Sequence, residues 1–335
     1  MHLSQGEPAN NGARTPARIN FADTKHVEGT PIEVHNSPVL KSVETKLYCG
    51  DCLNALKLFP DDTFDLIVTS PPYADQRKDT YGGIHPNKYV DWFLERSVEF
   101  LRVLKPTGSF VLNIKERVHN GERHIYVLEL ILALRKQGWL WTEEYIWHKR
   151  NCHPGKWPNR FRDAWERCLH FTKQSHFKMF QDNVKVPMGD WAKARLKNLG
   201  KNDVIRFDSQ VGSGFGKNIA NWVGRDMALP DNVLHFATEC SNKKHSATFP
   251  KPLPEWFIKL FTEPGDWVLD PFTGSGTTNV VASSLGRNSV GIDVLSEYIS
   301  LAEKSLNENT QNQKEVSKKG RKKAINGQLA FGTIN

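Results

Sequence analysis

Short apolar runs alternate with amphipathic stretches along most of this chain. The apolar runs predict buried strands at Leu47–Cys49, Phe64–Val68, Ser109–Ile114, Leu140–Trp147, Cys168–Thr172, Trp267–Asp270 and Ser289–Asp293. Stretches with helical spacing predict helices at Cys52–Phe59, Tyr89–Leu104, His124–Lys136, Pro254–Phe261, Thr277–Leu285 and Ser296–Leu306. Strands that alternate with helices in this way are typical of a doubly wound α/β fold, in which helices cover both faces of a mostly parallel sheet.

The alternation divides the chain into five segments. Residues 1–42 are rich in Asn, Pro, Thr, Gly and Ala without a sustained period, which predicts a mobile arm. Residues 43–172 and 245–308 carry the α/β pattern and form its two halves. Residues 173–244 lack a period and contain 12 Lys or Arg against 7 Asp or Glu, so they are either a DNA-reading insertion or a solvated surface excursion. Residues 309–335 hold a Lys/Arg block, which predicts a disordered basic tail.

Composition narrows the class of protein. The 335 residues contain no apolar run near the ~18 residues that a membrane span needs, and the first residues lack a secretory signal pattern, so a cytoplasmic protein is expected. Five cysteines are too few for a disulfide framework. Cys49 and Cys52 have CxxC spacing without a second ligand pair, so we expect thiols that face the core and no metal site. The net charge of +8 favours a polyanionic partner.

The first stretch with chemical meaning is Thr69–Tyr73, Thr-Ser-Pro-Pro-Tyr, which follows the apolar run Phe64–Val68. Each proline fixes φ and removes an amide donor, so the loop is stiff. Ser70 is therefore presented at the carboxyl end of a strand, where open α/β sheets bind ligands. A polar acceptor beside the flat ring of Tyr73 suits a planar base with an exocyclic amine. Taken alone, the four residues Ser-Pro-Pro-Tyr are equally consistent with a plain proline turn.

The second stretch, Asp270–Thr278, joins a predicted strand to a predicted helix and contains two closely spaced glycines. Glycines allow close backbone approach, and a helix N-terminus supplies free amides. Asp293 ends the next strand and is placed to take the hydroxyls of a ribose. Asn279 stands where the dinucleotide fingerprint has its third glycine, and the acidic Asp270 suits an ammonium group, so S-adenosylmethionine fits better than NAD. Considered one at a time, Asp270 is also plausible as a helix N-cap and Asp293 as a surface carboxylate at a strand end.

Together the two stretches resemble the motifs of the amino-group DNA methyltransferases. Ser70–Tyr73 matches their catalytic motif, [Asn/Asp/Ser]-Pro-Pro-[Tyr/Phe/Trp], and Phe272–Gly276 matches the Phe-x-Gly-x-Gly core of their cofactor motif. The catalytic motif comes first and a basic insertion follows it, an order that resembles the β group of the family. The resemblance implies a Rossmann-like sheet of seven strands with the last strand antiparallel, and a target-recognition role for residues 173–244. Residues 245–250 resemble the motif at the methionine side of the cofactor.

The resemblance also assigns roles to residues. It implies that Asp51 accepts from the adenine amine, that Asp270 meets the cofactor's amino group, and that Asp293 takes the ribose hydroxyls. The full cofactor set is Asp51, Cys52, Thr69, His245, Phe249, Pro250, Asp270, Pro271, Phe272, Thr273, Gly274, Ser275, Gly276, Thr277 and Asp293. The catalytic set is Ser70, Pro71, Pro72 and Tyr73, which hold the target base.

The nature of the target base follows from two features. None of the 18 prolines is followed by Cys, which argues against methylation at the cytosine ring carbon. Within the family, Ser in the first motif position favours N4 of cytosine. We therefore expect a site-specific enzyme that methylates N4 of a flipped cytosine in double-stranded DNA, as part of a restriction-modification system. The alternatives are N6 of adenine on the same fold and, further off, an amino group of RNA or protein. A cognate endonuclease is an expected partner, and the protein is expected to be a monomer or homodimer.

Basic residues near these motifs are candidates for DNA contact, with an ordinary charged loop as the alternative. They are Arg77, Lys78, Tyr81, Lys149, Arg150, Lys156 and Arg160. His148 and His153 lie in the same region as candidates for a general base, but the family mechanism requires none.

Overall fold

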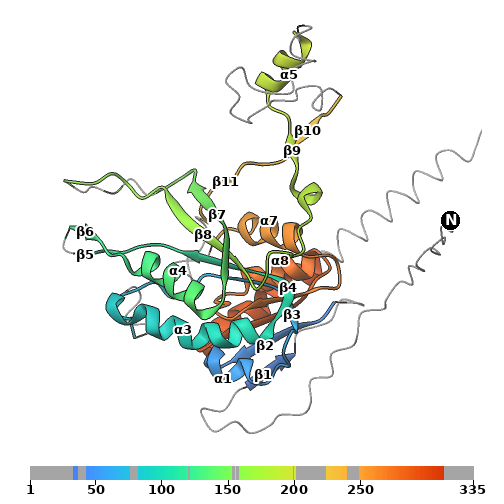
Figure 1. The fold of residues 1–335 in the computed structure, drawn as a ribbon. Coiled ribbons are helices and arrows are strands. Elements are labelled where there is room, and N and C mark those ends of the chain that lie inside the picture. The colour runs from blue at the N-terminus through green and yellow to red at the C-terminus, as the bar shows by residue number, and fades with distance from the viewer. Residues whose placement is uncertain are drawn as a thin grey trace, which may run out of the picture.

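A computed structural model describes residues 33–36, 43–75, 82–119, 121–152, 155, 158–198, 200, 224–239 and 249–312. Its main strands are β1 (Glu33–Asn36), β2 (Thr45–Cys49), β3 (Phe64–Thr69), β4 (Leu104–Ile114), β7 (Leu140–Lys149), β8 (Trp165–Thr172), β11 (Val233–Phe236), β12 (Trp267–Asp270) and β13 (Asn288–Asp293). They form one sheet in the order β1-β2-β13-β12-β3-β4-β8-β7-β11 (Figure 1). Segments from both ends of the described chain therefore share one sheet.

Helices cover both faces of the sheet, as predicted for a doubly wound fold (Figure 1). On one face lie α1 (Cys52–Leu56), α3 (Pro86–Val103) and α4 (Tyr126–Gln137), and on the other lie α7 (Pro252–Phe261), α8 (Thr277–Ser284) and helical residues 296–312. Alternate residues of one strand feed the two cores, because successive side chains point to opposite faces. Ile67 joins the cluster under α1, α3 and α4, whereas Leu66 and Val68 join the cluster under α7.

The central part of the sheet confirms the seven predicted strands and adds one strand at each edge. The additions are β1, antiparallel to β2, and β11, parallel to β7. One detail of the expectation was wrong. The antiparallel strand of the central seven is β8, which pairs antiparallel with both β4 and β7, whereas the last strand of the chain, β13, runs parallel to both of its neighbours.

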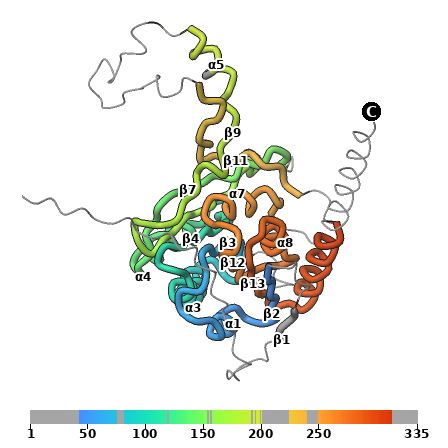
Figure 2. The backbone as a smooth tube through the Cα atoms, turned by 90° about the vertical axis from the view of Figure 1, so that its right-hand side faces the viewer, coloured from blue at the N-terminus to red at the C-terminus, as the bar shows by residue number. Residues whose placement is uncertain are grey.

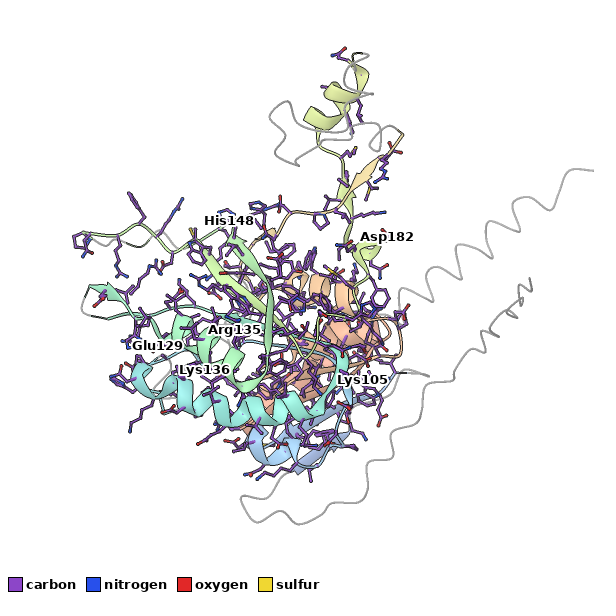
Figure 3. The ribbon with its side chains drawn as sticks, in the orientation of Figure 1. Lys105, Glu129, Arg135, Lys136, His148 and Asp182 are labelled. Atoms are coloured by element: carbon purple, nitrogen blue, oxygen red, sulfur yellow. The ribbon has the colours of Figure 1, made fainter. Side chains whose placement is uncertain are left out.

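Local chemistry explains where several elements begin and end. The helix α3 begins at Pro86, three residues before the predicted start, because proline suits a first helical turn and the His85 side chain accepts from the Asn87 amide. The helix α4 ends at Gly138, whose φ of 113° lies in the left-handed region that glycine adopts readily. Its charged residues Glu129, Arg135 and Lys136 point away from the sheet (Figure 3).

The predicted insertion, residues 173–244, contributes both to the sheet and to a projection. Its described elements are η1 (Gln181–Val184), β9 (Val186–Pro187), α5 (Asp190–Lys197), β10 (Met227–Ala228) and β11. The strands β9 and β10 pair antiparallel, and α5 stands apart from the sheet beyond them (Figures 1 and 2). A second small hairpin joins β5 (Val118–His119) to β6 (Glu122–Arg123). The basic block of the predicted tail lies outside the described residues. No helix in the described part of the chain is long and apolar enough to cross a membrane.

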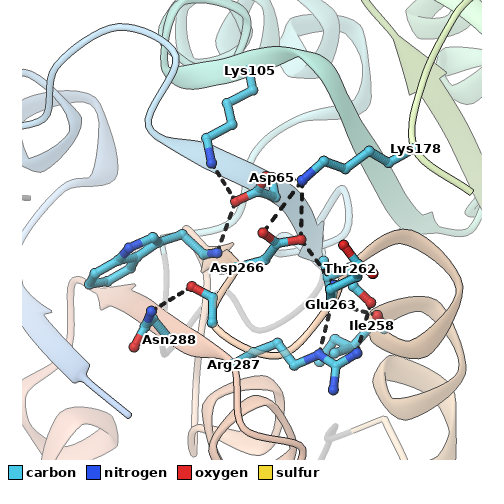
Figure 4. A network of polar contacts seen from close by, with 11 residues as sticks. Asp65, Lys105, Lys178, Ile258, Thr262, Glu263, Asp266, Arg287 and Asn288 are labelled. Carbon is cyan, nitrogen blue, oxygen red and sulfur yellow. Dashed lines mark hydrogen bonds and ion pairs between the residues drawn. The ribbon is translucent and has the colours of Figure 1, made fainter. Parts of the chain in front are cut away.

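A charged network closes the sheet at the amino end of β3 (Figure 4). Asp65 has a fully buried side chain and accepts from Lys105 Nζ at 2.7 Å, Lys178 Nζ at 3.0 Å and the Trp267 amide at 3.0 Å. Lys178 also reaches Asp266 at 3.3 Å. The starts of β3, β4 and β12 are thereby fastened together, at the edge of the sheet opposite to both sequence motifs.

Candidate active site

The two sequence motifs meet at the carboxyl edge of the sheet. The strands β3 and β12 are parallel neighbours, with Leu66 opposite Val268 and Ile67 opposite Leu269. The loops that follow them therefore start side by side. Thr69, at the end of β3, donates its hydroxyl to Asp270 Oδ1 at 2.6 Å across 201 positions of sequence.

Asp270 is the buried centre of this junction. Besides Thr69, it accepts from the Thr278 hydroxyl at 2.6 Å and from the Phe272 amide at 3.1 Å. The residue is only 1% exposed. Burial, with a smaller contribution from the charge of Asp293, raises the pKa of Asp270 to about 6, although the hydrogen bonds act in the opposite direction. A carboxylate held in this state is complementary to a ligand that carries a positive charge.

Asp293, at the end of β13, organises the glycine loop. Its Oδ2 accepts from the Gly274 amide at 3.0 Å, and its Oδ1 accepts from the Leu295 amide at 3.0 Å. The Gly50 amide donates to its backbone carbonyl at 2.9 Å, which brings the end of β2 to the same place. Asp293 thus holds together the loops after β2, β12 and β13, where the sequence placed the ribose.

Within the glycine loop, Gly276 faces a helix, whereas Ser275 and Thr277 line a cavity. Gly276 has a φ of +79°, and a Cβ added to it would lie 2.7 Å from the Cβ of Ala302. It therefore permits close packing of the helix at residues 296–312. Ser275 and Thr277 are partly exposed and line a cavity together with Phe249. The predicted methionine-side residue Phe249 is thus brought to the cofactor loop.

A second group of residues fits an adenine. Asp51 caps α1 by accepting from the Leu53 amide at 2.8 Å, and its other oxygen accepts from Arg96 at 2.8 Å. The Arg96 guanidinium lies 4.4 Å from the centre of the Trp92 ring, and the Trp92 and Phe272 rings are 5.8 Å apart. A partly exposed carboxylate beside two partly buried aromatic rings can accept from an exocyclic amine while the rings contact the face of the base.

The proline loop carries a hydrogen-bond chain of its own. Ser70 Oγ donates to Tyr73 Oη at 3.2 Å. Tyr73 Oη lies 2.7 Å from Glu166 Oε2 and 3.2 Å from Asn113 Oδ1. Glu166 in turn pairs with Lys149 Nζ at 2.5 Å. Burial, and next the charge of Glu166, raise the pKa of Tyr73 well above its ordinary value, so its hydroxyl stays protonated.

Not every predicted site residue faces this edge. Cys52 is 3% exposed and packs in the core, where burial raises the pKa of its thiol to about 12. Lys149, predicted to contact DNA, is paired with Glu166, while Arg150 is exposed just after β7 and Arg160 is partly buried. Six predicted residues lie outside the described residues, namely Arg77, Lys78, Tyr81, His153, Lys156 and His245. The roles given to all the site residues remain predictions, including those of Pro71, Pro72, Pro250, Pro271 and Thr273.

Four residues of the site escaped the sequence reasoning: Trp92, Arg96, Asn113 and Glu166. One signal was available for Arg96. It lies between Phe93 and Phe100 on the buried face of α3, and an arginine within an apolar stripe indicates a buried partner. Glu166 and Asn113 gave no comparable signal, because each occurs once within a strand and its partner is distant in sequence.

Comparison with known proteins agrees with this geometry. Residues 64–304 match the family model described as DNA methylase, which covers N6 and N4 methyltransferases. The type II methyltransferase M.PvuII of Proteus hauseri is 32% identical over 285 residues, covering 78% of this chain and 83% of the relative. The solved PvuII DNA methyltransferase, titled cytosine-N4-specific, superimposes with a TM-score of 0.60 at 26% identity, covering 83% of this chain and 95% of that one. The protein belongs to the N6/N4 DNA methylase family and is a DNA methyltransferase.

The family and the fold class predicted from the sequence are therefore confirmed. A further solved structure, a DNA modification methylase of Thermus thermophilus, was determined in complex with S-adenosyl-L-methionine and has a TM-score of 0.51. At 23% identity, with 80% of this chain and 96% of that one covered, it supports the fold alone.

Proposed function

We propose that this enzyme transfers a methyl group from S-adenosylmethionine to the exocyclic N4 amine of a cytosine in double-stranded DNA. The hydrogen bond between Thr69 and Asp270 carries the proposal, because it fastens the end of the catalytic strand to the start of the cofactor loop. The amine held by Ser70 and a ligand held at Asp270 would then be neighbours at one edge of the sheet.

The residues present suit this cofactor. Asp51, with Trp92 and Phe272 close by, offers an acceptor and ring faces for an adenine. Asp293 is the proposed acceptor for the ribose hydroxyls, and Asp270 supplies buried negative charge for a cation. When bound, S-adenosylmethionine supplies a methyl group on a positively charged sulfur, which is already a good electrophile.

The protein's task is to position the amine. Ser70 Oγ and the Pro71 carbonyl accept its hydrogens, so that the nitrogen rehybridises and directs its lone pair toward the methyl donor. Such positioning is worth up to ~7–11 kcal/mol in favourable cases. The base must leave the duplex stack at a cost of a few kcal/mol, and stacking on the ring of Tyr73 recovers ~1–3 kcal/mol. No covalent intermediate and no general base are needed.

Two features favour cytosine and DNA. The first motif position is Ser70, and the solved PvuII enzyme, 26% identical in the structural superposition, is titled cytosine-N4-specific. The net charge of +8 suits a polyanion, and the curated relatives are type II methyltransferases, which favours a role in a restriction-modification system with a cognate endonuclease.

Mass spectrometry of nucleosides tests the proposal, using DNA incubated with the protein and S-adenosylmethionine. N4-methylcytosine is the expected product. N6-methyladenine would keep the enzyme class and overturn the assignment of the base. The variant Ser70→Ala is expected to lose transfer while its affinity for S-adenosylmethionine, measured by calorimetry, is retained. Normal turnover in that variant would remove Ser70 from the mechanism, and methylation of RNA or protein alone would overturn the DNA substrate.

A further inference from the structure

The hydrogen-bond chain behind the proline loop fixes the direction in which the Ser70 hydroxyl points. We propose that Glu166 is a positioning residue which, through Tyr73, makes Ser70 an obligatory hydrogen-bond acceptor for the amine of the target base. The inference rests on the proposed amine substrate and deepens it. Its basis is the set of contacts from Ser70 to Tyr73 at 3.2 Å, from Tyr73 to Glu166 at 2.7 Å and from Glu166 to Lys149 at 2.5 Å.

The direction follows from counting donors and acceptors. Tyr73 has one hydroxyl proton and faces two groups that can only accept at that point. Glu166 is a carboxylate, and Asn113 presents Oδ1 because its Nδ2 donates to the Arg167 carbonyl at 3.2 Å. The shorter and charged contact is to Glu166, so the Tyr73 proton goes there. The Tyr73 oxygen is then free to accept, and Ser70 must be the donor.

This direction matters because a serine hydroxyl is ambivalent. It can donate or accept, and its proton rotates to suit its neighbours. With its proton turned toward Tyr73, Ser70 offers only lone pairs to the open side of the loop. Lone pairs attract the hydrogens of an exocyclic amine and leave the nitrogen lone pair free to attack. A proton turned outward would instead repel those hydrogens or bind that lone pair.

Lys149 holds the Glu166 carboxylate in place behind Tyr73. Its ammonium bonds the second oxygen of Glu166, and both side chains are largely buried, with exposures of 15% and 9%. The ring of Trp147 lies 5.0 Å from the ammonium. The Glu166 carboxylate accepts from both the ammonium and the Tyr73 hydroxyl, and the ion pair fixes its position behind Tyr73. We accordingly assign Lys149 to this network instead of to a DNA phosphate.

Two conservative variants test the chain. Glu166→Gln replaces an obligatory acceptor by a group that can donate, and Tyr73→Phe keeps the ring while removing the acceptor for the Ser70 proton. Each is expected to lower kcat by about 100-fold, the scale found when one oriented hydrogen bond at a reacting centre is removed. The dissociation constant for S-adenosylmethionine should stay near the wild-type value. Glu166→Gln leaves Lys149 without its buried partner, so its melting temperature is expected to fall, and kcat is compared at a temperature at which every variant is folded. Because both variants act through one chain, the double variant should lose no more than the worse single variant.

The matched control is Glu116→Gln. Glu116 is also buried, at 8% exposure, and pairs with Arg167, the neighbour of Glu166 on β8. Its described contacts do not include Tyr73, so its kcat should stay near wild type. Equal losses in Glu116→Gln and Glu166→Gln, or losses that multiply in the double variant, would show a general structural effect and overturn the proposal.

A binding measurement provides a readout apart from turnover. The DNA sequence that the wild-type enzyme methylates is prepared with its target cytosine or with uracil, which has a carbonyl oxygen in place of the amine. The wild type, with Ser70 as an acceptor, should prefer cytosine, and Glu166→Gln should reduce that preference by about tenfold, since its Ser70 is free to donate. The cost of extruding a given base from the duplex is the same for both proteins, so it cancels when the preference of the variant is compared with that of the wild type. For an adenine target, hypoxanthine replaces uracil.

The outcomes separate the two hypotheses. A wild-type enzyme that methylates no base would overturn the proposed function itself. If the wild type is active, and Glu166→Gln has a normal kcat and an unchanged base preference, only the role of Glu166 is overturned.

Discussion

Two buried aspartates on neighbouring strands of the sheet differ in the groups that surround their carboxylates. Asp65, near the start of β3, is met by the ammonium groups of Lys105 and Lys178 (Figure 4). Asp270, at the end of β12, is met by two hydroxyls and one backbone amide from the described residues. The first carboxylate has counter-charge within the protein, and the second has, among the described residues, hydrogen bonds without a cation.

The difference separates structure from function. A buried charge is costly unless it is paired, so the lysines at Asp65 complete a network that needs nothing further. At Asp270 the cost of burial is visible as a pKa raised to about 6. When such a group is ionised at neutral pH, a cationic ligand that binds beside it supplies the missing counter-charge, which favours binding. The amino edge of the sheet therefore stabilises the fold, and the carboxyl edge is the proposed binding site for S-adenosylmethionine.

Removing the charge at the amino edge should produce the largest effect. Asp65→Asn leaves Lys105 and Lys178 without their buried partner and is expected to lower the free energy of unfolding by about 3 kcal/mol. This is the low end for breaking a buried pair, because both lysines are about one-third exposed. Urea denaturation measures the change, and the affinity of the folded variant for S-adenosylmethionine should be unaltered.

The control for Asp65→Asn is Asp62→Asn, which breaks the exposed contact between Asp62 and Lys173. A surface pair of this kind contributes about 0–1 kcal/mol. If the two variants lost equal stability, burial of Asp65 would not be what makes its network important.

The role of Asp270 at the carboxyl edge could be predicted from the sequence, whereas the charged network of Asp65 at the amino edge could not. Asp270 follows an apolar run and precedes two glycines, so its place at a ligand site followed from local order along the chain. Asp65 lies inside the run Phe64–Val68, and its partners Lys105, Lys178 and Trp267 are 40 to 202 positions away. No period or motif encodes such a contact, because it arises only when the sheet has assembled.

The same distinction holds within the site. The loops bearing Ser70 and Asp270 were predicted because the prolines and glycines within each short motif determine the local conformation of the backbone. The contact of Tyr73 with Glu166 was not predicted, since β8 enters the sheet antiparallel beside β4 and brings Glu166 to the loop from 93 positions away. The sheet's central strands followed from periodicity, whereas the edge strands β1 and β11 lie in segments without a sustained pattern.

Removing the charge at the carboxyl edge should affect binding instead of stability. Asp270→Asn keeps the shape of the side chain and one acceptor while it removes the negative charge. The affinity for S-adenosylmethionine is expected to fall about 30- to 100-fold, the range for losing a buried interaction with a charged group. The unfolding free energy at pH 7 should change little, because removal of the charge relieves the burial cost that raises the pKa. Calorimetric titration and urea denaturation measure the two quantities, and a large loss of stability with normal binding would reverse the comparison.

The smallest and most specific effect is the pH dependence of cofactor affinity. Because the pKa of Asp270 is raised to about 6, the carboxylate is ionised at pH 7.0 and mostly protonated at pH 5.5. The neutral form attracts a cation less, so binding must weaken as the pH falls through 6. If only the ionised form binds, the dissociation constant for S-adenosylmethionine should rise about fourfold between pH 7.0 and pH 5.5. The sign is opposite for stability without ligand, since ionisation at higher pH disfavours the folded state. Asp270→Asn should show a flat profile over this range, and an equal fourfold change in that variant would assign the titration to another group.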